Sequence, residues 1–67
     1  MDYTVTNHGS IWLIQPLTET AANWFADNLP EDAPMLGNAY AVEPRYVGDI
    51  IMGAQNAGLT SNVEITA

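Results

Sequence analysis

One pattern occurs twice in this chain: an apolar run ends at a proline, and an amphipathic segment follows it. In the first copy, residues 11–17 (IWLIQPL) precede residues 18–29 (TETAANWFADNL). In the second copy, residues 39–51 read AYAVEPRYVGDII. A short apolar run bounded by turn residues is typical of a buried strand, and apolar spacing of three and four is typical of a helix. The pattern therefore predicts two strand-then-helix units.

The first unit carries helix-boundary signals at both ends. Thr18 is a good N-cap, and Glu19 lies in the first turn, where the helix dipole favours an anion. Pro30 ends the helix because a proline cannot continue it. Apolar residues at intervals of three and four predict a buried stripe on this helix. They are Ala21, Trp24, Phe25 and Leu29.

The second unit has a different set of boundary signals. Pro44 fits the first helical position, where its missing N–H costs nothing. Gly58 is the expected residue just after the helix, and Leu59 is the hydrophobic residue that accompanies such a cap. One apolar face is predicted on this helix as well. It consists of Val47, Ile50, Ile51 and Ala54.

The remaining segments complete an α+β prediction. Residues 3–7 (YTVTN) alternate and are β-branched, so we expect either a hairpin of this segment with the apolar run at residues 11–14, or residues 1–9 as an edge strand or arm. Residues 30–37 (PEDAPMLG) are expected as a loop and residues 62–66 (NVEIT) as a final strand. We therefore predict a small single domain, residues 1–67, of order β(β)αβαβ. Two helices would pack on one face of a three- to four-stranded sheet, whose strand order and direction stay open.

Composition argues against most catalytic and metal-binding chemistry. The chain has 67 residues, no cysteine and a single histidine, His8. A disulfide or a zinc site built from cysteine and histidine is therefore excluded. No nucleophile elbow or phosphate-binding glycine loop is present either. We expect no enzyme activity, no metal and no cofactor.

The charge balance is the most unusual property of the chain. Its net charge is −7, because eight carboxylates are opposed by Arg45 alone and there is no lysine. Such a chain repels nucleic acid and anionic lipid and attracts basic surfaces. Solubility is the alternative explanation of the acidity. Arg45 is expected to pair with Asp49, four residues on, or otherwise with Glu43 at the strand-to-helix corner.

The spacing of the acids suggests mimicry of a polynucleotide. Glu19 and Asp27 share a helix face about 12 Å apart, at a rise of ~1.5 Å per residue. Glu31 and Asp32 continue that line beyond the helix end. Phosphate contacts provide much of the affinity of DNA-binding proteins, so regularly spaced carboxylates can replace them. The secondary candidates for contact with a partner are Glu43, Asp49 and Glu64.

Some segments also resemble known sequences. GSIWLIQPLTETAANWF and GNAYAVEPRYVGDIIMGAQNAGL are similar to small uncharacterised proteins of phages and mobile elements in proteobacteria, over residues 5–60. The most specific stretches are residues 42–46 (VEPRY) and 53–59 (GAQNAGL). Proteins of this size, acidity and origin resemble anti-CRISPR proteins, which bind bacterial surveillance complexes, often over the DNA-binding surface. The resemblance implies an inhibitor of a type I complex (Cascade), with no catalytic residues.

Two further expectations concern location and an alternative function. No apolar run approaches the roughly 20 residues of a membrane span, and a signal peptide is not evident, so we expect the host cytoplasm. The alternative is a small structural or regulatory adaptor of a mobile element, a monomer or weak homodimer, whose acidity serves only solubility. Its contact surface would be apolar. The candidates are Met35, Leu36, Tyr40 and Met52.

Overall fold

Strands β1 (Tyr3–Asn7) and β2 (Trp12–Pro16) form an antiparallel hairpin in the computed structural model, which describes residues 1–63. Gly9 has a φ of +80°, which glycine adopts without a steric penalty, and its N–H donates to Oδ1 of Asn7 at 2.7 Å. The hairpin is one of the two arrangements predicted for this segment. β1 lies at the edge of the sheet.

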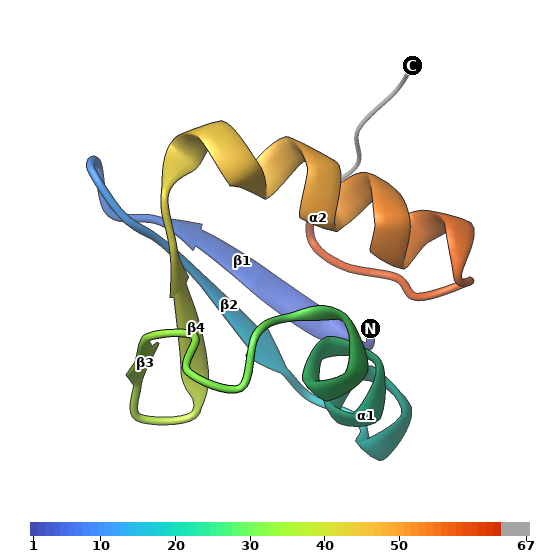
Figure 1. Cartoon of the computed structure of the whole chain (residues 1–67). Coiled ribbons are helices and arrows are strands. Elements are labelled where there is room, and N and C mark those ends of the chain that lie inside the picture. The colour runs from blue at the N-terminus through green and yellow to red at the C-terminus, as the bar shows by residue number, and fades with distance from the viewer. Residues whose placement is uncertain (64–67) are drawn as a thin grey trace.

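Within residues 1–63 the sheet has four antiparallel strands, in the order β1-β2-β4-β3. Strand β4 (Ala39–Val42) pairs with β2, so that Ile14 lies opposite Tyr40. Because side chains alternate along a strand, Val5, Ile14 and Tyr40 point to one face of the sheet. Both helices pack on that face (Figure 1).

The predicted loop 30–37 contains a strand that the sequence reasoning missed. Strand β3 (Met35–Leu36) pairs with β4, with Leu36 opposite Ala39. Only Gly37 and Asn38 connect them, and Gly37 has a φ of +61°. A glycine first in a two-residue connection is typical of a tight hairpin turn. The fold is therefore α+β as predicted, with this strand added.

Helix α1 (Glu19–Asn28) begins and ends where the sequence predicts. The hydroxyl of Thr18 accepts from the N–H of Ala21 at 3.1 Å, which satisfies one of the free donors of the first turn. At the other end, the N–H of Leu29 still donates to the carbonyl oxygen of Phe25, and Pro30 follows. The predicted N-cap is confirmed.

Helix α2 (Pro44–Asn56) is bounded by the predicted proline and glycine. Gly58 has a φ of +88°, and its N–H donates to the carbonyl oxygen of Gln55 at 2.9 Å. The N–H of Leu59 reaches the carbonyl oxygen of Ala54 at 3.0 Å. These two bonds form a Schellman motif, and Leu59 is buried beneath it, as predicted.

The core lies between the inner face of the sheet and the two helices. Tyr3, Ile14 and Phe25 are fully buried, and the rings of Tyr3 and Phe25 meet edge to face with centroids 5.2 Å apart. Both tryptophans, Trp12 and Trp24, pack against this core and are partly buried. The predicted helix stripes are confirmed by the buried residues of each helix. These are Ala21, Phe25, Val47, Ile51 and Ala54.

The segment after α2 returns to β1. The N–H groups of Asp2 and Tyr3 donate to the carbonyl oxygen of Thr60, and Ser61 forms a single parallel bridge with Tyr3. The predicted strand 62–66 lies mostly outside the described residues, and Glu64 lies outside them.

Candidate functional site

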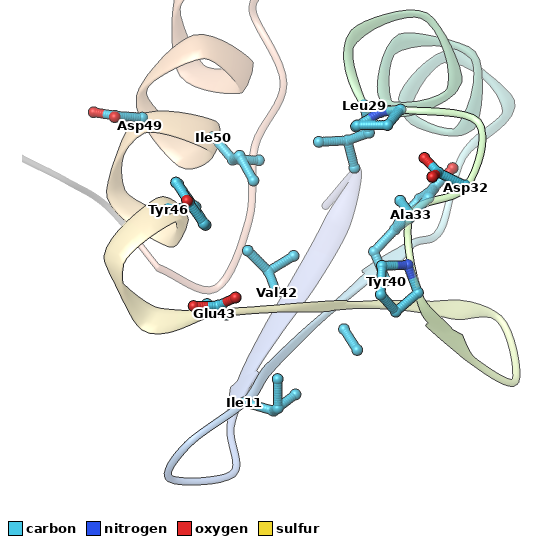
Figure 2. A pocket seen from close by; sticks show the side chains of 13 residues that line it. Ile11, Leu29, Asp32, Ala33, Tyr40, Val42, Glu43, Tyr46, Asp49 and Ile50 are labelled. Atoms are coloured by element: carbon cyan, nitrogen blue, oxygen red, sulfur yellow. The ribbon is translucent and has the colours of Figure 1, made fainter.

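An apolar groove lies where α2 and the segment after α1 diverge over strand β4. It has a volume of about 720 Å³, which is within the range of about 300–1,000 Å³ for ligand pockets. Tyr40 and Val42 of β4 form its floor. Figure 2 shows Leu29, Asp32 and Ala33 on one wall and Tyr46, Asp49 and Ile50 on the other.

The first wall is the proline-bounded segment 29–34. Leu29 and Pro30 start it where α1 ends, and the N–H of Ala33 donates to the carbonyl oxygen of Pro30 at 3.0 Å. The carbonyl oxygen of Pro34 accepts from the N–H of Ala41 in β4 at 2.9 Å. These bonds hold the wall against the sheet without filling the space above Val42.

The second wall is the beginning of α2. Pro44 starts the helix directly after β4, so the first two turns rise from the end of the floor strand. Ile50 is partly buried and faces the groove, whereas Tyr46 keeps 49% of its surface exposed. The guanidinium of Arg45 lies 4.8 Å from the centroid of the Tyr46 ring, which restrains that ring at the mouth.

Three of the predicted contact acids line this groove. They are Asp32 on the first wall, Glu43 at the end of β4, and Asp49 on α2. All three are exposed, and Figure 2 shows the Asp49 carboxylate at the outer edge of its wall, pointing away from the groove. The groove is therefore apolar inside and negatively charged at its margin.

One of these acids is neutralised locally. Arg45 pairs with Glu43, with Nε 3.0 Å from Oε2, so the expected pairing with Asp49 is wrong and the alternative pairing with Glu43 is confirmed. Glu43 precedes the helix and Arg45 is its second residue, so the corner between β4 and α2 brings the two together. Within residues 1–63 this is the one ion pair.

The structure does not bring the other predicted acids to the groove. Glu19 and Asp27 on α1 and Glu31 in the following segment are exposed to solvent, outside the lining of the groove. They have no counter-charge within hydrogen-bonding or ion-pair distance in the described part of the chain. Glu64 lies outside the described residues.

Asp2, by contrast, stabilises the fold through its hydrogen bonds. Its Oδ2 accepts from the Thr60 N–H at 2.9 Å and from the Thr60 hydroxyl at 3.2 Å, and its Oδ1 accepts from the Thr18 hydroxyl at 3.1 Å. The Thr60 N–H, with smaller contributions from the two hydroxyls, lowers the pKa of Asp2 from its ordinary value of 3.8. Asp2 thus joins the start of β1 to the cap of α1 and to the segment after α2.

The apolar lining is what the sequence reasoning missed. Leu29 was expected only as a member of the buried helix stripe, and Ala33 and Pro34 only as loop. The available signal was the pair Pro30 and Pro34, because prolines at this spacing prevent a helix or strand from closing the space beside β4. Among residues 1–63, no three histidine, aspartate or glutamate side chains gather as metal ligands, and no helix is long and apolar enough to cross a membrane.

Comparison of the chain with protein-family models, with curated proteins and with solved structures finds no match. The similarity to small phage proteins and to anti-CRISPR inhibitors therefore stays a prediction.

Proposed function

We propose that this protein is an inhibitor of the anti-CRISPR kind, which binds a bacterial CRISPR surveillance complex and occupies the basic surface that target DNA would use. The observation that carries the proposal is the lack of counter-charge. Arg45, the one basic residue besides His8 and the chain start, is already paired with Glu43. Glu19, Asp27, Glu31, Asp32 and Asp49 are left exposed and unopposed within the described residues.

These carboxylates are held by a stiff support. α1 is capped by Thr18, and the 29–34 segment is bonded to β4, so the acids on them keep defined positions. A partner with a lysine- and arginine-lined channel gains the same kind of charge-assisted contacts from carboxylates as from phosphates. Because no lysine is present, no part of this surface repels such a channel strongly.

Binding to a purified type I surveillance complex at two salt concentrations tests the proposal. We expect the affinity to fall steeply between about 0.05 M and about 0.5 M salt, because screening shortens the reach of exposed charges. Glu31→Gln combined with Asp32→Asn should weaken binding about tenfold at the lower salt. Thr6→Lys combined with Gln15→Lys makes the same change in net charge on the sheet face that the helices leave open. This control should change the affinity by no more than about twofold.

Two results would contradict the proposal. An affinity that is indifferent to salt would mean that the contact is apolar. Equal losses in the two double variants would mean that only net charge matters and that no acidic surface is recognised.

A second candidate function, a small adaptor that associates with itself, is favoured by one observation. Met35 and Leu36 on the edge strand β3 are 50% and 61% exposed, and Met52 on α2 is 41% exposed. An open edge strand with apolar side chains can pair with a second chain. Light scattering over a range of concentrations tests this candidate. A mass that doubles with concentration, and that Leu36→Asp returns to the monomer value, would support it.

A further inference from the structure

The groove over β4 differs from the acidic surface around it, because the interior of the groove is apolar. Leu29, Ala33, Val42 and Ile50 present carbon to a space that solvent can enter. Apolar surface left in an open hollow is a common mark of a binding site. Electrostatic mimicry of DNA does not need such a hollow, since phosphate-like contacts need only exposed carboxylates.

The charge around the groove selects what can enter it. Asp32 and Asp49 stand on opposite walls with no ion-pair partner among the described residues, and Glu43 is at one end with Arg45 beside it. An apolar segment with acidic flanks would be repelled at both walls. An apolar side chain flanked by lysine or arginine would place carbon on the floor and cations at the margin.

We propose that the groove binds an amphipathic, basic segment of the partner protein. An apolar side chain would sit over Val42, one lysine or arginine would lie at Asp32, and a second would reach across the edge of α2 to Asp49. The inference rests on the proposed function, because it names the part of the partner that this face contacts. A protein segment is favoured over a small molecule by shape, since the groove is partly open between its two walls and a longer chain can lie across it.

This apolar contact would affect a different step of binding from the acidic surface. Exposed charges mainly speed encounter and set orientation, whereas a buried apolar anchor slows dissociation. The groove would therefore supply the part of the affinity that salt does not screen.

The probe for this groove is a synthetic peptide of lysine and leucine. It is about 15 residues long so that it can form a helix. Two control peptides replace every leucine by serine or every lysine by glutamate. Each is titrated into the full-length isotope-labelled protein while amide chemical shifts are recorded. We expect the lysine–leucine peptide to shift the amides of Ala33, Tyr46 and Ile50, and to leave Thr4 and Thr6 on the open sheet face unchanged.

Substitutions then test the groove itself. Ala33→Phe places a ring into the groove and should weaken binding of the lysine–leucine peptide at least about tenfold. Ala26→Phe adds the same ring at an exposed position of α1 outside the groove and should change the affinity by no more than about twofold. If Ala33→Phe does not fold, the amide chemical-shift changes in the unsubstituted protein still show whether the peptide binds in the groove.

The outcomes separate this inference from the proposed function. If the lysine–serine peptide binds as tightly as the lysine–leucine peptide, and Ala33→Phe has no effect, the groove inference is overturned while the acidic surface stands. If the glutamate–leucine peptide binds equally well, or the shifts map outside the groove, the basic occupant is wrong. If neither cationic peptide binds at low salt, both the inference and the proposed function fail.

Discussion

Arg45 lies with its Nε 3.0 Å from Oε2 of Glu43, at the corner where β4 becomes α2. Both side chains are well exposed, with 69% and 55% of their surfaces accessible, so the pair is worth little to stability. Its effect on the groove is larger. It cancels one of the three negative charges at the margin and leaves those of Asp32 and Asp49 available to a partner.

Arg45→Gln is therefore expected to lower the stability of the protein slightly and to raise its affinity for the lysine–leucine peptide. The free energy of unfolding should fall by no more than about 1 kcal/mol, the sum expected from an exposed ion pair and an exposed cation–π contact. Affinity for the lysine–leucine peptide should rise by up to about fivefold, because one unscreened charge at short range in water contributes about 1 kcal/mol. Urea unfolding and peptide titration measure the two effects. A loss of affinity would show that Arg45 itself contacts the partner.

Asn62 closes the edge of the sheet at β1. Its Oδ1 accepts from the N–H of Val5 at 2.8 Å, and its Nδ2 donates to the Val5 carbonyl oxygen at 3.0 Å, so the side chain replaces a neighbouring strand. Asn62→Ala should lower the free energy of unfolding by about 1–2 kcal/mol through the loss of two hydrogen bonds. It should also promote association at high concentration, because an edge strand is opened. Thr6→Ala is the matched control for chemical denaturation and light scattering, because Thr6 lies on the same strand and its side chain makes no hydrogen bond within residues 1–63.

Gly53 marks the place where the Trp24 side chain of α1 reaches α2. A Cβ at this position would lie 3.3 Å from Cη2 of Trp24, which is tight for carbon atoms. Gly53→Val adds two further carbons toward the ring and should lower the free energy of unfolding by about 1–3 kcal/mol through overpacking. In a helix valine is favoured over glycine, so a loss of stability at position 53 cannot come from helix propensity. Met52→Val, at the exposed neighbouring position away from Trp24, is the control and should cost no more than about 0.5 kcal/mol. Equal losses in both variants would show that α1 and α2 do not meet here.

Asp2 should make stability depend on pH in the acid range. Because its pKa is lowered in the folded state, its hydrogen bonds stabilise the fold above its ordinary pKa of 3.8, and that contribution is lost as the pH falls through the folded value. The difference in unfolding free energy between the unsubstituted protein and Asp2→Asn should thus be full near neutral pH and shrink below about pH 3.8. Urea unfolding at a series of pH values measures it. A difference that stays constant through the acid range would refute the role of the Asp2 carboxylate.

The features that were predicted correctly from the sequence depend only on residues that are close together along the chain. Thr18, Pro44 and Gly58 mark helix boundaries because a cap or a fixed backbone angle acts on its immediate neighbours, and these boundaries are confirmed. The spacing of Phe25 and Ile51 likewise fixes which helix face is buried. Such signals do not depend on how the elements are arranged in space.

The features that the sequence did not decide depend on how the strands and helices are arranged in space. Strand β3 exists because Met35 and Leu36 find partners in β4, although Gly37 and Asn38 had the chemistry of a hairpin turn. Of the two partners expected for Arg45, the corner between β4 and α2 selects Glu43 over Asp49, and helix spacing alone could not decide between them. The groove results from the path of segment 29–34 beside α2, so no pattern within one element predicts it.

Competition between this protein and target DNA for a type I surveillance complex is the most direct measurement. With labelled target DNA at a fixed concentration, added protein should displace the DNA, and the apparent Kd of the DNA should rise in proportion to the protein concentration. The same titration with the Glu31→Gln, Asp32→Asn variant should need about tenfold more protein. Target DNA that stays bound at saturating protein would contradict the proposal that these carboxylates take the place of a polynucleotide.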